Sequence, residues 1–223
     1  MSGIQAESLT KSYVVEGVTT EVLKGIDLHI NEGESLCLYG PSGAGKSTLL
    51  YLLGGLEKPT TGRVKVLGCD LQQMGDDELS LFRNKKMGFI FQFHHLLPDF
   101  SALENVMMPL LIGGMSTQQA RKASQDMLSV VGLLERQQHR PSQLSGGEQQ
   151  RVAIARALVH KPKFIFADEP TGNLDHINGG KVFDLLLSLN RELRATLVVV
   201  THNESMTGLF NKKIKILDGR IDH

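Results

Sequence analysis

The sequence predicts an α/β fold with a mostly parallel core sheet, an antiparallel β layer near the N-terminus and an inserted helical subdomain. Two observations predict it. Short apolar runs of four or five residues alternate with helical repeats, and residues 103–140 contain helical repeats without a strand-like run. A length of 223 residues with 41% hydrophobic side chains is typical of one globular domain with a sizeable core.

The core strands are expected at residues 35–39, 87–91, 164–167 and 197–200. Each run is almost entirely apolar and too short for a buried helix, which is typical of strands covered on both faces of a parallel sheet. The first 35 residues and residues 63–67 instead alternate polar and apolar side chains, so an antiparallel layer is expected there.

The helix faces follow from apolar residues that recur every three or four positions. They are Ala120, Ala123, Met127 and Val130 in one helix, Val152, Ala155 and Leu158 in a second, and Val182, Leu186, Leu189 and Leu193 in a third. We expect one domain over residues 1–223, with the helical subdomain inserted at about 93–160.

Charge and cysteine content exclude several classes of protein. The 24 basic side chains balance the 24 acidic ones, so no nucleic-acid partner is expected. No apolar run approaches the length of a membrane-spanning helix, and the first residues lack the pattern of a secretory signal. Two cysteines are too few for a disulfide framework and suit a reducing compartment.

The strongest functional signal is a glycine-rich loop between the expected strand at 35–39 and a helical run. Its sequence, GPSGAGKST, matches the phosphate-binding loop G-x-x-x-x-G-K-[ST] in the required context. In such a loop the backbone N–H groups face phosphate oxygens, the lysine reaches the β- and γ-phosphates, and the next hydroxyl ligates Mg²⁺. The expected nucleotide-binding residues are Gly40, Pro41, Ser42, Gly43, Ala44, Gly45, Lys46, Ser47 and Thr48.

Two adjacent carboxylates, Asp168 and Glu169, follow the apolar run FIFA. Parallel sheets bind ligands at the carboxyl ends of their strands, so these side chains are expected to face the same phosphates. Asp168 is predicted to hold Mg²⁺, and Glu169 to position or deprotonate the attacking water. The alternative is a solvated strand end that caps the next helix, and the phosphate loop favours the catalytic interpretation.

A third signal is LSGGE, in which Ser145, Gly146 and Gly147 precede a helix. A hydroxyl and unobstructed backbone N–H groups at a helix N-terminus bind anions, although an ordinary N-cap has the same sequence. Two phosphate-binding helix starts in one chain indicate that one nucleotide is held by both. This sharing requires either close approach within one chain or two copies that face each other.

Together these motifs resemble the ATP-binding cassette (ABC) ATPases over nearly the whole chain. GPSGAGKST, a glutamine after a strand, LSGGE, FIFADEP, GNLD and VVVTH occur in the order found in that family. The resemblance implies an ATP-dependent P-loop fold and a head-to-tail homodimer, in which LSGGE of one copy faces the γ-phosphate of ATP on the other.

The same resemblance implies roles for four further residues. Gln92 would ligate Mg²⁺ and sense the partner, and Asp175 would communicate across the dimer. His202 would contact the γ-phosphate and complete a catalytic set with Lys46 and Glu169, while a further residue, Tyr13, would stack on adenine. Taken alone, a histidine at a strand end is more often a hydrogen-bonded structural residue, and a lone glutamine is usually a surface side chain. An aromatic near an N-terminus could equally belong to the core.

Within the ABC family, FQFHHLLPDF and DEPTGNLD are similar to the ATPases of lipoprotein-releasing complexes. That resemblance implies a peripheral protein at the cytoplasmic face of a bacterial inner membrane. It would contact two integral membrane subunits through the segment between Gln92 and Asn105, and these subunits would pass lipoproteins toward the outer membrane. ATPases of macrolide-type efflux and cell-division complexes share most of these residues and stay open as alternatives.

Two other classes of protein are less compatible with the sequence. A soluble ABC ATPase without a membrane partner usually carries two cassettes or a long coiled coil, and the stretch between Gln92 and Ser145 has room only for a compact insert. A small-molecule kinase would need neither LSGGE nor Glu169. His94 and His95 are expected on a surface loop, because adjacent side chains of an extended segment point apart and no third metal ligand is near.

Overall fold

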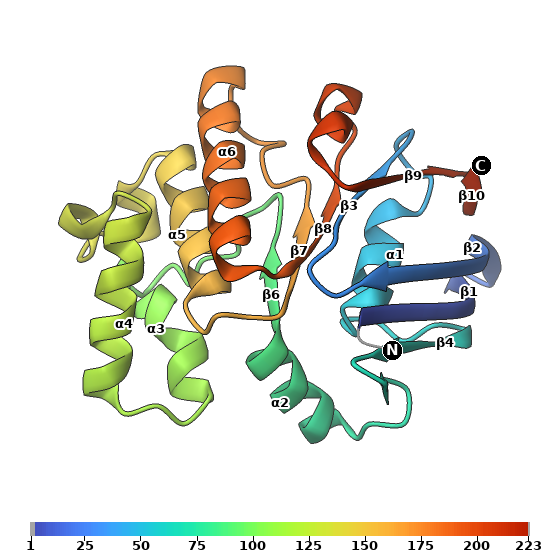
Figure 1. Ribbon diagram of the computed structural model, residues 1–223, viewed down its shortest axis with the longest axis horizontal. Coiled ribbons are helices and arrows are strands. Elements are labelled where there is room, and N and C mark those ends of the chain that lie inside the picture. The colour runs from blue at the N-terminus through green and yellow to red at the C-terminus, as the bar shows by residue number, and fades with distance from the viewer. Residues whose placement is uncertain (1–2, 223) are drawn as a thin grey trace. The chain divides into compact units, whose positions relative to one another are not determined.

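The computed structural model describes residues 3–222, apart from the side chains of residues 176, 177, 204 and 205 (Figure 1). The chain divides into two compact units. The first comprises the residues up to Arg83 and those from Thr196 onward, and the second comprises residues 84–195. The stretch expected to form the helical subdomain, 93–160, lies inside the second unit.

An antiparallel sheet forms part of the first unit. Its strands are β1 (Gly3–Val15), β2 (Val18–Asn31), β4 (Thr61–Val66) and β5 (Cys69–Asp70), in the order β2-β1-β4-β5. β1 pairs with both β2 and β4, and alternate side chains such as Ile4 and Ala6 are buried. The antiparallel layer predicted from the alternating sequence is therefore confirmed.

The parallel strands of the first unit carry the phosphate loop. The strand order is β10-β9-β3-β8, for β10 (Arg220–Asp222), β9 (Lys212–Leu217), β3 (Ser35–Tyr39) and β8 (Thr196–Val200). The last three are parallel, and β10 is an antiparallel edge strand paired with β9. β3 runs parallel to both of its neighbours, and Leu38 pairs with Val200, so β3 and β8 end at the same edge. Helix α1 (Lys46–Leu53) follows β3, and a short 3₁₀ helix, η3 (Glu204–Leu209), follows β8.

The second unit combines parallel strands with a group of helices. β6 (Met87–Ile90) pairs with β7 (Phe164–Asp168). The helices are α3 (Ala102–Ile112), α4 (Thr117–Val130), α5 (Gly146–Leu158) and α6 (His176–Leu193), with 3₁₀ turns η1 (Leu134–Arg136) and η2 (Pro141–Gln143). Helix α2 (Asp76–Lys86) leads into this unit, and α3 packs against both α4 and α5 (Figure 1).

Serine–glutamate capping boxes define where α3 and α5 begin. Ser101 Oγ accepts from the Glu104 backbone N–H, and the Glu104 carboxylate accepts from the Ser101 backbone N–H at 2.8 Å. Ser145 and Glu148 repeat the same arrangement at the start of α5. Each box satisfies backbone N–H groups that a helix start leaves unpaired, so the sequence fixes both helix starts locally.

The predicted core strands are confirmed, with ends that differ by one residue, as in β6, which ends at Ile90. One predicted helix face is partly wrong. Val130 of α4 is 55% exposed, because the buried side chains of this helix are Ala120, Ser124 and Leu128, at four-residue spacing. In the part of the chain that the structure describes, no helix has both the length and the apolar character needed to cross a bilayer.

Candidate functional site

The phosphate loop leaves β3 at Gly40 and enters α1 at Lys46. Gly40 has a φ of 138°, and a Cβ there would lie 2.2 Å from the Ile216 carbonyl oxygen, so a side chain does not fit. Gly45 is the N-cap of α1, with a left-handed φ of 97°. The loop therefore ends at the N-terminus of α1, where the backbone N–H groups and the helix dipole favour an anion.

The ammonium group of Lys46 is buried and bound to this loop. The residue is 7% exposed, and Nζ donates to the carbonyl oxygens of Gly40 at 3.0 Å and Pro41 at 2.8 Å. A cation is thereby held beside the N-terminus of α1. Its charge adds to the helix dipole, so the loop has the electrostatics of a polyphosphate site.

The turn after β8 brings His202 to the same edge of the sheet as the phosphate loop. The Thr201 backbone N–H donates to the Leu38 carbonyl at 3.1 Å, which ties the end of β8 to β3. Thr201 Oγ1 also accepts from the Asn203 backbone N–H at 3.0 Å. His202 therefore sits on an anchored turn, and it is exposed to solvent.

Tyr13 lies on β1 and is half-buried in the first unit. Its phenol donates to Glu57 Oε2 at 2.6 Å, and the Thr48 side chain also forms a hydrogen bond with it. Burial, and then the Glu57 bond, raise the pKa of Tyr13, so the phenol keeps its proton. Because Thr48 belongs to the first turn of α1, the ring is attached to the helix that follows the phosphate loop.

In the second unit, Gln92, Asp168 and Glu169 lie just beyond or at the ends of neighbouring parallel strands. Ile90 of β6 pairs with Ala167 of β7, so the residues that follow leave from the same edge. Asp168 is 7% exposed. Glu169 has a φ of 45°, a left-handed conformation that is uncommon for a residue with a side chain. Such strain is concentrated at functional sites, where the surrounding structure maintains it.

Gln92 is held in place by the turn that precedes α6. Its Nε2 donates to Asn173 Oδ1 at 3.3 Å, and Asn173 Nδ2 donates to the Gln92 carbonyl oxygen at 2.8 Å. A Cβ on Gly172 would lie 3.0 Å from Gln92 Nε2, so the glycine leaves room for the glutamine side chain. These contacts orient Gln92 from the segment that contains GNLD.

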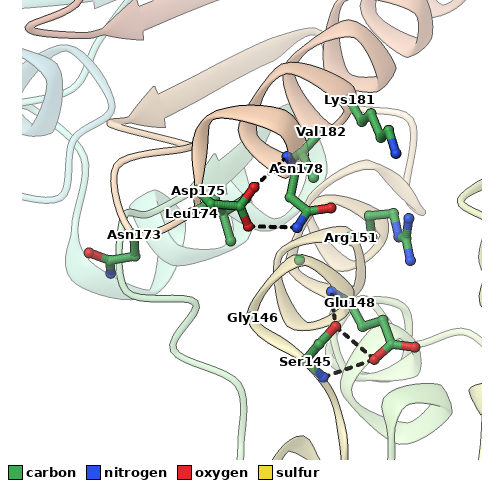
Figure 2. Close-up of a pocket in the computed structure, with 11 residues that line it drawn as sticks. Ser145, Gly146, Glu148, Arg151, Asn173, Leu174, Asp175, Asn178, Lys181 and Val182 are labelled. Carbon is green, nitrogen blue, oxygen red and sulfur yellow. Dashed lines mark hydrogen bonds between the residues drawn. The ribbon is translucent and has the colours of Figure 1, made fainter.

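Two helix N-termini meet at one cavity of about 280 Å³ in the second unit (Figure 2). Ser145 caps α5 and Asp175 caps α6, and both line the cavity together with Gly146 and Gly147. The structure thus brings together the LSGGE residues and the aspartate of GNLD. Hydrogen bonds from the Ser145 backbone and side chain lower the pKa of Glu148, so this capping carboxylate is charged near neutral pH.

Two basic residues of this cavity, Arg151 and Lys181, were not predicted from the sequence. Each lies six positions after the residue that caps its helix, Ser145 for Arg151 and Asp175 for Lys181. The sequence does carry a signal for these two residues. In both helices, a basic residue follows the capping residue by six positions, and the helix start between them contains glycine or asparagine. The dipoles of the two helices and the two side-chain cations attract an anion to this cavity, while the Glu148 and Asp175 carboxylates, which also line it, repel one. The side-chain charges therefore balance, and the attraction for an anion comes from the two helix starts.

Helix α5 is bonded to the segments that carry the other predicted residues of this unit. Gln150 Nε2 donates to the carbonyl oxygen of Pro170 at 2.7 Å, directly after Glu169. The Arg156 guanidinium donates to the carbonyl oxygens of His95 at 2.7 Å and His94 at 2.8 Å. His95 is exposed and His94 is half-buried, and among the described residues no group of His, Cys, Asp and Glu side chains could hold a metal ion.

Comparisons with known proteins identify the family of this chain. A model of the ABC transporter family matches residues 23–172. The chain is 51% identical, over 98% of both sequences, to a lipoprotein-releasing system ATP-binding protein, LolD, of Syntrophus aciditrophicus. It is 50% identical, over 98% of its own length and 96% of the relative, to the protein of that name from Legionella pneumophila.

Solved structures show the same fold. The ATP-binding cassette MJ0796, described as a dimer in a post-hydrolysis state bound to ADP and phosphate, is 41% identical, with a TM-score of 0.91 over 99% of this chain and 97% of the cassette. A second dimeric structure of that bacterial cassette gives the same TM-score at 42% identity. With a phosphate loop, an LSGGE helix start and full-length likeness to these cassettes, the chain belongs to the ABC transporter family.

Proposed function

We propose that this chain is the ATP-hydrolysing subunit of a membrane ABC complex that releases lipoproteins from the bacterial inner membrane toward the outer membrane. The observation that carries the proposal is identity of about half of the residues, over nearly the whole of both chains, with proteins named for lipoprotein release. The reaction is hydrolysis of ATP to ADP and phosphate, coupled to lipoprotein release. The chain would work at the cytoplasmic face of that membrane as a peripheral subunit.

ATP would be bound between two copies of the chain. The triphosphate would lie on the phosphate loop of one copy and against the cavity lined by Ser145 and Asp175 in the other. The anion-binding character of both surfaces supports this arrangement, because a shared polyphosphate would satisfy both at once. The dimeric structures of a cassette 41–42% identical to this chain support it too.

The oxygen atoms of three predicted residues fit Mg²⁺. The Ser47 hydroxyl, the buried Asp168 carboxylate and the Gln92 amide are hard oxygen donors of the kind this cation prefers. The Gln92 amide nitrogen is bonded to Asn173, so the amide oxygen is the atom that would face a cation. Mg²⁺ supplies charge stabilisation on the phosphate oxygens when it is bound.

The remaining roles follow from position. Lys46 would hold the β- and γ-phosphates, and Glu169 would position or deprotonate the water that attacks the γ-phosphate. His202 would contact the γ-phosphate from the anchored turn after β8. Asp175, whose carboxylate caps α6 by accepting from the Asn178 backbone N–H at 3.0 Å, would lie at the contact between copies.

The segment between Gln92 and Asn105 would receive the two membrane subunits. It exposes large apolar side chains, with Phe93 66% exposed, Leu97 38% and Phe100 39%. Large apolar side chains exposed along one segment suit a protein contact. Closure of the two cassettes on ATP would then act on the membrane subunits through this segment, and hydrolysis would reopen the dimer.

Substitutions in the nucleotide site test the ATPase part of the proposal. Glu169→Gln should bind ATP, hydrolyse it at least about a hundredfold more slowly, and accumulate as a dimer in size-exclusion chromatography. Lys46→Ala should lose most of its ATP affinity in a direct binding titration. Turnover like that of the wild type in Glu169→Gln, or unchanged binding in Lys46→Ala, would refute these assignments.

Purification from native membranes tests the lipoprotein part. The tagged chain is isolated in a mild detergent, and the proteins that co-purify are identified by mass spectrometry. Two related membrane proteins, together with ATP-dependent transfer of lipoproteins in reconstituted vesicles, are the expected result. A single efflux or cell-division protein as partner would move the function within the ABC family, and the absence of any membrane partner would refute the proposal.

A further inference from the structure

An ion pair lies against the ring of Tyr13 in the first unit. Lys11 Nζ is 4.9 Å from the ring centroid and 3.1 Å from Glu57 Oε2. The same carboxylate oxygen accepts the hydrogen bond of the Tyr13 phenol at 2.6 Å. Glu57 Oε2 therefore binds two groups: the phenol hydroxyl of Tyr13 and the Lys11 ammonium that lies over the face of the same ring.

The ammonium group is fixed by a further contact that does not involve the ring. Lys11 Nζ donates to the Lys58 carbonyl oxygen at 2.8 Å, and the side chain of Lys11 is 16% exposed. The Glu57 side chain is 31% exposed. An ammonium that has lost most of its water interacts with an aromatic face more strongly than an exposed one does, so Lys11 is expected to stay on this face.

This arrangement determines how a flat ligand can approach Tyr13. Because the ammonium occupies one face of the ring, a base can stack only on the opposite face. The faces of two aromatic systems both carry partial negative charge, and a cation behind one of them reduces their repulsion. The phenol bond to Glu57, with the contact from Thr48, keeps the ring from turning away.

We propose that Lys11 and Glu57 are positioning residues, which orient the Tyr13 ring and prepare the face opposite Lys11 to stack on the base of a nucleotide. The inference rests on the proposed ATPase function and on the role that the ABC resemblance implies for Tyr13, stacking on adenine, and it adds two residues that lie outside every motif of the sequence. It predicts an effect on recognition of the base that is separate from binding of the phosphates.

The test compares two probes in calorimetric titrations of the full chain with Mg²⁺. The β,γ-imido analogue of ATP carries the base, and inorganic tripolyphosphate does not. The variants are Tyr13→Leu, Lys11→Met, which keeps an unbranched side chain without charge, and Glu57→Gln, whose amide oxygen can accept from the phenol but carries no charge to form an ion pair with the ammonium. Lys11→Arg restores the cation, and Lys58→Met removes a neighbouring charge whose side chain points to Asp76 at 3.4 Å.

In Lys11→Met and Glu57→Gln, affinity for the ATP analogue should fall about three- to tenfold, while affinity for tripolyphosphate stays within about twofold. Lys11→Arg should regain most of the loss, and Lys58→Met should bind both probes as the wild type does. Equal weakening of both probes would overturn the inference, because it would indicate general damage to the site. The inference would also be overturned if Tyr13→Leu bound the ATP analogue more weakly while Lys11→Met and Glu57→Gln bound it as the wild type does. That result would leave the proposed function intact. A wild-type chain that binds neither probe would overturn both.

Discussion

Asn105 gives the sharpest prediction about the segment proposed to face the membrane subunits. This residue of α3 is fully buried, and its amide makes four hydrogen bonds to the preceding loop. Oδ1 accepts from the Leu97 backbone N–H at 2.8 Å, and the two hydrogens of Nδ2 are shared among three carbonyl oxygens, those of Leu97, Phe100 and Ser101. Asn105→Ala removes all of these bonds.

The expected loss of stability follows from these bonds. Each intramolecular hydrogen bond contributes about 0.5–1.5 kcal/mol net. Leu97 and Phe100 lie in an exposed segment, so their backbone groups can bind water after the substitution and the full desolvation cost is not added. We therefore expect the free energy of unfolding to fall by about 2–4 kcal/mol, which corresponds to a Tm lower by roughly 5–15 °C in a chain of this size.

Thermal unfolding followed by circular dichroism measures this change. Gln118→Ala is the matched control, because it removes an amide from an exposed position of α4 in the same unit and should change the Tm by no more than about 2 °C. An Asn105→Ala variant that unfolds at the same temperature as Gln118→Ala would refute the reasoning. It would mean that the loop is held by its apolar contacts and not by the buried amide.

Three further predictions concern packing and pH. Gly88→Ala should lower the Tm by more than 5 °C, because the new Cβ would lie 2.2 Å from the Ala157 carbonyl oxygen. A Tm like that of the wild type would contradict the close approach of β6 and α5. Gly180→Ala should instead raise the free energy of unfolding by about 0.5–1 kcal/mol in denaturant titrations, since nothing lies within 4 Å and the residue is inside α6. Burial lowers the pKa of His160 below its ordinary value of 6.5. The neutral imidazole therefore stabilises the fold fully above pH 6.5, and this stabilisation is lost as the pH falls toward the lowered pKa. When the pH is lowered from 7.5 to 5.5, the Tm of the wild type should therefore fall further than the Tm of His160→Gln. Equal decreases in Tm would exclude His160 as the cause of the acid destabilisation.

The sequence was sufficient for those parts of the fold that depend on local patterns. Apolar runs placed the parallel strands, and the serine and glutamate of LSGGE form the capping box that starts α5. Val130 shows the limit of this reasoning. Its spacing from Met127 suits a buried helix face, but α4 turns a different row of side chains inward, and only the position of the neighbouring helices decides which row that is.

The parts of the candidate site that sequence reasoning missed depend on contacts between distant segments. Arg151 and Lys181 stand on different helices and share a cavity only because the starts of α5 and α6 come together. Two strands and a helix separate Lys11 from Glu57 in the sequence, yet one carboxylate oxygen of Glu57 reaches both Lys11 and Tyr13. The left-handed backbone of Glu169 is likewise set by its surroundings, because its residue type does not favour that conformation.

Within the second unit, one helix connects the residues expected to meet nucleotide with those expected to meet the membrane subunits. Ser145 at the start of α5 lines the anion cavity, and Arg156 in its last turn binds the backbone of His94 and His95. A second connection runs through stacked aromatic rings. Phe166 of β7 stacks on Phe89 at 5.4 Å, Phe89 on Phe91 at 6.2 Å, and Phe91 meets the edge of His95 at 5.3 Å.

Both connections end at His95, whose φ of 46° shows that its backbone is held in a strained conformation. A packed helix and a row of stacked rings deform little, because protein interiors are close-packed. If the start of α5 or the strand that carries Asp168 moves, the packed residues between it and His95 deform little. The movement is therefore transmitted to His95. The proposed closure on ATP would thereby reach the partner-facing segment without a change in the fold of the second unit.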